Sequence, residues 1–157
     1  RTASGVRGIS MADTDEVVGM VTVEDFSKTV LVVSEKGFGK RTYLNDPETD
    51  EPIYRVTNRG GKGVKTLNIT DKTGNLIAIK DVTDDDDLMI INKSGITIRM
   101  HVADIRSQGR ATQGVKLINL KGSDQIAAVA KVERDDEEDM IEGDEPNNDS
   151  GNIIDKE

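Results

Sequence analysis

The sequence has no cysteine and no tryptophan, and His101 is its only histidine. The absence of cysteine excludes a disulfide framework and thiolate metal sites. A single histidine excludes a histidine-rich zinc centre and leaves no spare candidate for a catalytic Ser/His triad. No apolar run approaches the roughly 18 residues that a membrane helix needs. We therefore expect a cytoplasmic protein without a metal site or a membrane segment.

Aromatic and hydrophobic residues are also scarce, at 3% and 34% of the 157 residues. These fractions are small for a globular chain and indicate that part of the chain lies outside the core. The length suits one domain rather than two. Because the chain starts at Arg1 without a methionine or an apolar leader, we interpret it as a piece of a longer polypeptide.

The negative charge is concentrated at one end of the chain. The formal net charge is -9, but residues 133–157 hold 12 acidic and 2 basic residues, whereas residues 1–132 hold 18 acidic and 19 basic residues. A segment with strong self-repulsion and little apolar content cannot offset the entropy that ordering costs. We therefore expect a folded body over residues 1–132 and a disordered acidic tail over 133–157.

The body repeats itself. Three segments share the pattern Arg-x-x-x-Gly-Val-[Arg/Lys] and start at Arg1, Arg59 and Arg110, at intervals of 58 and 51 residues. The segments 30–37 and 88–95, each of four apolar residues followed by three polar residues and a glycine, also correspond, again 58 residues apart. A period near 50 residues that is rich in short β segments is typical of propeller-like blades.

Short runs of Val, Ile and Leu bounded by Gly, Asn, Asp and Ser predict β-strands, and no long apolar stripe of helical period is present. We predict an all-β, propeller-like repeat of four-stranded antiparallel blades, about two and a half of them, with a half blade at 1–28 and blades at 29–83 and 84–132. The predicted strands lie near residues 6–11, 17–23, 29–34, 38–44, 64–69, 76–82, 88–92, 96–101, 115–120 and 126–132.

Positive charges recur at matching points of the repeat. Equivalent positions of stacked repeats lie along one rim, and a curved positive track suits a phosphate backbone. The glycine-rich run 59–63 also leaves backbone N–H groups open to a phosphate. The candidate DNA-binding residues are Arg1, Arg7, Arg41, Arg55, Arg59, Gly60, Gly61, Lys62, Gly63, Lys65, Arg99, Arg106, Arg110 and Lys116.

Other motifs predict no chemistry. Gly63 follows Lys62 where a Walker A loop needs Ser or Thr. The run 84–87 consists of four aspartates but lacks the spacing of a calcium loop, so we expect a solvated loop rather than a metal site. The methionines 11, 20, 89 and 100 alternate with Val and Ile and are expected in the core. No catalytic residue is predicted.

Several motifs together resemble the C-terminal domain in the A subunit of bacterial DNA gyrase. They are the run 59–64 with Tyr54 and Arg55 upstream, the run 104–115 and the acidic tail. The similarity covers essentially all of residues 1–132, and several motifs agree in order and spacing. The signature box of that family is Gln-[Arg/Lys]-Arg-Gly-Gly-[Arg/Lys]-Gly. Here Thr57 and Asn58 replace its first two residues while the next five match. We interpret this run as a later copy, with the full box upstream of the chain.

The resemblance implies a β-pinwheel, a propeller-like disc whose neighbouring blades exchange strands and whose basic rim wraps double-stranded DNA. It implies that ATP-driven strand passage by the holoenzyme then introduces negative supercoils. The implied partners are the rest of the gyrase A subunit, together with the gyrase B subunit, in the bacterial cytoplasm at the chromosome. The implied catalytic residues, ATP and Mg²⁺ belong to other parts of that enzyme, so this chain alone is expected to be no enzyme and to hold no cofactor.

Two alternatives stay open. The related C-terminal domain in the A subunit of topoisomerase IV bends DNA without full wrapping, and supports decatenation. A propeller that serves as a protein–protein scaffold would make the recurring Arg and Lys incidental.

Overall fold

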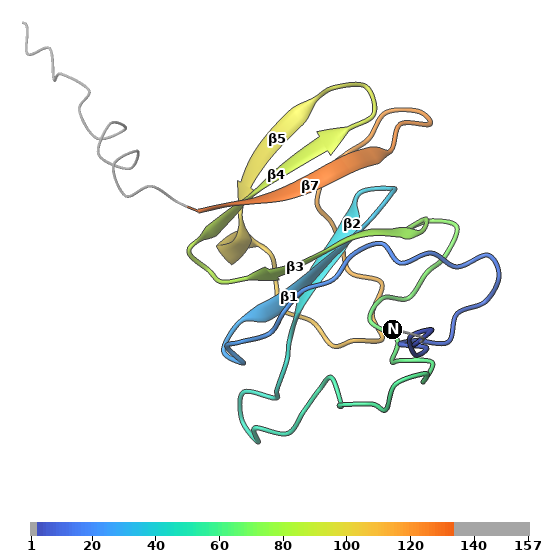
Figure 1. Cartoon of the computed structure of the whole chain (residues 1–157). Helices are drawn as coiled ribbons and strands as arrows, with labels where there is room; N and C mark the ends of the chain where they lie inside the picture. The colour runs from blue at the N-terminus through green and yellow to red at the C-terminus, as the bar shows by residue number, and fades with distance from the viewer. Residues whose placement is uncertain (1–2, 134–157) are drawn as a thin grey trace, which may run out of the picture.

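The computed structural model describes residues 3–133, and their fold is all-β, as predicted. Two antiparallel sheets lie one above the other in Figure 1. No helix in this part of the chain is long and apolar enough to cross a membrane. The elements are β1 (Thr29–Ser34), β2 (Phe38–Tyr43), β3 (Leu76–Val82), β4 (Asp86–Asn92), β5 (Thr97–His101), the 3-10 helix η1 (Val102–Asp104), β6 (Val115–Lys116) and β7 (Ile126–Glu133).

The predicted disordered tail, residues 133–157, lies outside the described residues apart from Glu133, the last residue of β7.

The first sheet has the strand order β3–β1–β2–β6, and every residue of β1 is buried. Successive side chains of a strand point to opposite faces, so a fully buried strand needs cover on both faces of its sheet. Leu31 and Val33 belong to the core that the two sheets share, together with residues of β4 and β7. Val30 and Val32 pack on the other face against Leu67. The unbroken apolar run of β1 therefore reflects its position in the middle of the molecule.

The second sheet has the order β5–β4–β7 and reproduces the geometry of the first. The pairing of β4 with β7 has a register shift between Ile91 and Asn92. The pairing of β1 with β3 has the same irregularity between Val33 and Ser34, 58 residues earlier in the sequence. The two sheets are therefore repeats of each other even at this local level.

A short strand joins the two repeats. Val115 and Lys116 of β6 follow the second repeat's β5 in the chain, yet they pair with Gly39 and Phe38 of β2. The expected second blade therefore does not contain four consecutive strands of one sheet. Strand exchange between neighbouring repeats, as the resemblance implies, supplies the fourth strand of the first sheet.

Three predicted strands are not formed. Residues 6–11, 17–23 and 64–69 have no ladder, apart from one parallel bridge between Ile9 and Gly61. Their apolar pattern suits a strand, but in the described part of the chain their backbones make only isolated hydrogen bonds to other segments and no continuous ladder. The prediction that Met11 and Met20 lie in the core is wrong for the same reason, since they are 47% and 87% exposed. The other two predicted core methionines are half-buried.

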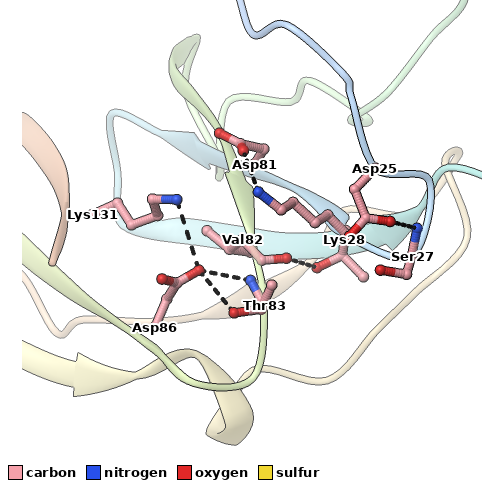
Figure 2. Close-up of polar contacts among 9 residues, drawn as sticks. Asp25, Ser27, Lys28, Asp81, Val82, Thr83, Asp86 and Lys131 are labelled. Carbon is pink, nitrogen blue, oxygen red and sulfur yellow. Dashed lines mark hydrogen bonds and ion pairs between the residues drawn. The ribbon is translucent and has the colours of Figure 1, made fainter. Parts of the chain in front are cut away.

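A tight turn connects β3 to β4, where the chain crosses from the first sheet to the second (Figure 2). The Asp86 carboxylate accepts hydrogen bonds from the Thr83 backbone N–H at 2.7 Å and from its hydroxyl at 3.1 Å. Lys131 of β7 lies 3.9 Å from the same carboxylate. Lys28, just before β1, pairs with Asp81 at 3.5 Å. These contacts fix the crossing without using the basic loops.

Gly114 lies directly before β6, where the chain passes close to β2. Its φ is +80°, and a β-carbon there would come within 2.6 Å of the Gly39 carbonyl oxygen. The equivalent glycines of the other two segments, Gly5 and Gly63, have φ values of 80° and 75°. The sequence repeat is therefore also a repeat of backbone conformation.

The substitution Gly114→Ala should lower the free energy of unfolding by about 2 kcal/mol, because alanine is strained at positive φ and its β-carbon would meet the β2 backbone. Urea unfolding measures the change. Gly109→Ala is the matched control, since Gly109 has no positive φ and has space for a β-carbon. Equal stability of the two variants would contradict the close approach of β6 to β2.

Candidate nucleic-acid interface

The cationic side chains fall into two groups, those that meet a carboxylate and those that do not. Within residues 3–133, ion pairs to carboxylates form at Lys28, Arg41, Arg99 and Lys131. Eight predicted DNA-binding cations make no ion pair within residues 3–133. Seven of them are exposed, and the eighth, Arg110, is half-buried. We call these eight the candidate cations: Arg7, Arg55, Arg59, Lys62, Lys65, Arg106, Arg110 and Lys116. Arg1 lies outside the described residues.

Arg41 is buried, with only 9% of its surface exposed. Its guanidinium forms an ion pair with Asp84 and donates to the Ile105 carbonyl oxygen. Its own carbonyl oxygen accepts a hydrogen bond from the Gln108 N–H at 2.8 Å. Arg41 therefore binds β2 to the segment after η1, which leaves little of it available to a ligand.

Arg99 stands at the equivalent position of the second repeat and also pairs with a carboxylate. Its Nε lies 2.6 Å from Asp87 Oδ2, and Nδ1 of His101 lies 2.6 Å from Asp87 Oδ1. Burial opposes ionisation of Asp87, but hydrogen bonds from His101 and Arg99 outweigh it and lower its pKa below the usual value. The two recurring arginines of β2 and β5 thus both pair with an aspartate, although Arg41 is buried and Arg99 is exposed.

The aspartate run 84–87 is the solvated loop that the sequence predicts only at Asp84 and Asp85, which are exposed in the turn between β3 and β4. Asp86 and Asp87 are buried at the start of β4, and Asp84 meets the guanidinium of Arg41. The run supplies negative charge to cations on neighbouring strands. Residues 3–133 contain no group of three or more His, Asp or Glu side chains placed to hold a metal ion.

The first two basic segments lie against each other. The Gly60 N–H donates to the Gly8 carbonyl oxygen at 2.8 Å, and the Ser10 N–H donates to the Gly61 carbonyl oxygen at 2.9 Å. These bonds place Arg7, one residue before Gly8, beside the glycine-rich run that carries Arg59 and Lys62.

The same bonds occupy amides that the sequence assigned to a phosphate. The Gly60 N–H is bound to Gly8, and the Gly61 N–H donates to the Asn58 carbonyl oxygen at 3.2 Å. Gly60 and Gly61 therefore donate to the chain's own backbone, and Gly60 has the positive φ of 75° that its turn requires. Positive charge in this run comes from the side chains.

The second and third basic segments are joined in a comparable way. Arg110 Nη1 donates to the Lys65 carbonyl oxygen at 3.2 Å. The Asn68 N–H donates to the Thr112 carbonyl oxygen at 3.0 Å. All the candidate cations except Lys116, which lies in β6, thus lie on loops that touch each other in chain order, from the segment at Arg7 to the segment at Arg110.

Lys40 of β2 binds the backbone of the third basic segment. No motif in the sequence indicated this role. The Lys40 side chain is fully buried, and its Nζ donates to the carbonyl oxygens of Gly109 at 2.5 Å and Arg110 at 2.6 Å and to the Thr112 hydroxyl at 3.0 Å. Burial, and then the nearby Arg110 guanidinium, lower the pKa of Lys40 to about 8. The available signal was a break in the repeat, because the equivalent residue of the second repeat is Ile98.

Sequence comparison agrees with this geometry. The family model for the DNA gyrase C-terminal domain, a beta-propeller, matches residues 1–24, 28–46, 54–83 and 86–133. The chain belongs to this family. The resemblance to the C-terminal domain in the A subunit of DNA gyrase is therefore confirmed.

This gyrase-type chain has relatives of high identity. It is 48% identical over 143 residues to the A subunit of DNA gyrase from Staphylococcus aureus strain NCTC 8325 / PS 47, and 49% identical over 139 residues to that of strain MRSA252. The alignments cover 90% and 88% of this chain. The chain spans only 15% of the length of each of these relatives.

Two solved structures share the fold of this gyrase-type chain. The C-terminal domain of DNA topoisomerase IV matches with a TM-score of 0.71 and 21% identity, over 82% of this chain and 38% of that one. A DNA gyrase A C-terminal domain matches with a TM-score of 0.55 and 24% identity, over 66% of this chain and 33% of that one. Both matches support the propeller-type architecture.

The lowered pKa of the buried Lys40 should make the free energy of unfolding depend on pH in the alkaline range. Its pKa is about 8 in the folded domain against an ordinary 10.5, so between these values the unfolded chain binds more protons and the free energy of unfolding rises with pH. Urea unfolding of the parent and of Lys40→Met at pH 7.5, 9 and 10 isolates this contribution. The parent should gain stability relative to the variant across the series. Parallel pH profiles would contradict a lowered pKa.

Proposed function

We propose that this chain binds double-stranded DNA through the candidate cations and wraps it, as the C-terminal domain of a gyrase A subunit. The observation that supports it is the row of exposed Arg and Lys side chains that meet no carboxylate in residues 3–133. Aspartates are abundant in the same domain and do pair with Arg41, Arg99, Lys28 and Lys131. Charge left uncompensated beside so many acids suits an anionic ligand.

The chemistry of these side chains favours the DNA backbone over the bases. Long, flexible cations on loops bind phosphates and release counterions, which supplies affinity without reading sequence. The described residues offer no recognition helix, since η1 has three residues. Specificity would then come from how easily the DNA bends along the loops.

We assign this domain a positioning role within the longer protein. The rest of the gyrase A subunit, together with the gyrase B subunit, supplies the catalytic residues and binds ATP and Mg²⁺, and ATP-driven strand passage by the holoenzyme introduces negative supercoils. DNA that follows the basic loops reaches those parts along a fixed path. The bacterial cytoplasm, at the chromosome, is the corresponding location.

The topoisomerase IV alternative has the higher TM-score, but at 21% identity that match carries the fold alone. Identity of 48% to the A subunit of DNA gyrase favours gyrase. A holoenzyme assay on relaxed plasmid separates the two, because gyrase introduces negative supercoils while topoisomerase IV leaves the plasmid relaxed. A scaffold function would instead give protein pull-downs that nuclease does not alter and no salt-dependent DNA binding.

The triple variant Arg55→Gln/Arg59→Gln/Lys62→Gln of the full-length protein should bind linear duplex DNA at least tenfold more weakly at low salt. The slope of log affinity against log salt should fall by about 2.7, since each lost phosphate contact removes about 0.9. DNA titrations at several salt concentrations measure both quantities.

The control variant is Lys28→Gln/Lys80→Gln/Lys131→Gln, which removes the same charge from the strands and the crossing shown in part in Figure 2. It should keep the parent's salt slope. An equal loss of DNA affinity and salt slope in both variants would mean that only net charge matters. The proposal that the basic loops bind DNA would then be wrong.

A further inference from the structure

A pocket of about 450 Å³ lies between the β1–β2 turn, β6 and the turn that precedes β7. Three lysines line it: Lys36 from the β1–β2 turn, Lys72 from the turn before β3, and Lys116 from β6. Only Lys116 recurs in the repeat, because the residue equivalent to Lys36 is Ser94. Lys36 and Lys72 therefore line the pocket although the comparison of repeats could not identify them as candidate DNA-binding residues.

The three ammonium groups have no carboxylate partner within residues 3–133. The Lys36 Nζ donates to the Asp71 carbonyl oxygen, which leaves its charge uncompensated. The Lys72 Nζ lies 5.5 Å from the centre of the Phe38 ring, where a cation–π contact holds it without neutralising it. Lys116 is exposed. All three charges therefore remain available to an anion.

One carboxylate, that of Asp124, also lines the pocket, and both of its oxygens accept hydrogen bonds from neighbouring residues. Asp124 Oδ2 accepts a hydrogen bond from the Ser94 hydroxyl at 2.8 Å, and Oδ1 accepts one from the Gln125 N–H at 2.9 Å. The bond from Ser94 is the main cause that lowers the pKa of Asp124. Since this carboxylate makes no ion pair with the lysines, the lining keeps an excess of positive charge.

The pocket continues the path of the candidate cations. Lys116 belongs to both sets, and it follows the segment of Arg106 and Arg110 by a few residues. Lys40 of β2 binds the carbonyl oxygens of Gly109 and Arg110. Phe38, two residues earlier in β2, lines the pocket. A phosphate backbone that passes over that segment therefore reaches the pocket next. The volume lies within the usual range for ligand pockets, about 300 to 1,000 Å³, so phosphate groups can enter rather than only touch its edge.

We propose that this pocket binds phosphate groups of the wrapped DNA, with Lys36 and Lys72 as additional contacts to those the repeat predicts. The proposal rests on the proposed DNA-wrapping function. It extends the DNA path from the basic loops across the boundary between the two sheets. The ligand chemistry is the phosphodiester, and the free phosphate ion is the competing source.

The test is the double variant Lys36→Gln/Lys72→Gln in the full-length protein, titrated with linear duplex DNA across salt concentration. The affinity at low salt should fall about tenfold or more, and the salt slope should fall by about 1.8. The control Lys28→Gln/Lys131→Gln removes the same charge at the crossing in Figure 2 and should keep the parent's slope.

The loop triple variant, measured in parallel, separates the two proposals. If the triple variant loses affinity and slope while the pocket variant matches the parent, the pocket inference is overturned and the wrapping function stands. If the parent itself shows no salt-dependent DNA binding, both are overturned.

A second measurement distinguishes DNA phosphates from a free ion. Inorganic phosphate is titrated against the melting temperature of the parent and of the pocket variant. If phosphate raises the melting temperature of the parent alone while both bind DNA equally, the pocket is a free-anion site and the DNA assignment is wrong. A loss of DNA affinity in the pocket variant supports the proposal, whichever way the melting temperature responds.

Discussion

The pairing of β6 with β2 is the contact on which the rest of this structure depends. Only two residues of β6 pair, yet they join the repeats, because the chain on one side carries Arg106 and Arg110 and the chain on the other packs Leu117 and Leu120 against the shared core. The approach is close enough that Gly114 admits no side chain. Both the third basic segment and the pocket lined by Lys36, Lys72 and Lys116 are therefore positioned by one short strand exchange.

Burial sorts the charges of this domain. A buried charge is costly unless it is paired or fully hydrogen-bonded, and the fold meets that requirement for Arg41, Asp87 and Lys40 with neighbouring carboxylates, cations or carbonyl oxygens. Exposed cations on loops have no such requirement, so their charge remains available to a ligand. The formal net charge of -9 is a sum over the whole chain, so it indicates neither the paired buried charges nor the exposed cations.

How much the sequence could predict follows from which interactions are local. The apolar runs at 29–34 and 76–82 were predicted with correct bounds, because β1 and β3 lie in a sheet with full ladders. The run at 64–69 has a similar pattern and forms no strand, since pairing depends on a neighbour that the pattern does not contain. The ion-pair partner of Arg41 is Asp84, 43 residues away in the sequence. The sequence pattern therefore could not predict that Arg41 is buried. Lys36 and Lys72, the proposed pocket contacts, do not recur in the repeat, so the repeat pattern could not indicate them.

The occupied amides of the glycine-rich run change what kind of binding this surface can provide. Backbone N–H groups aimed at one phosphate would make a rigid, localised anion site, but Gly60 and Gly61 donate to the chain's own carbonyl oxygens. Binding is left to side chains on several loops, each with a modest and strongly screened contribution. Useful affinity then needs many contacts at once, which a ligand supplies only if it is long, evenly charged and follows the loops from one repeat to the next. Duplex DNA has these properties, so this surface suits the proposed extended wrap better than a single tight phosphate site.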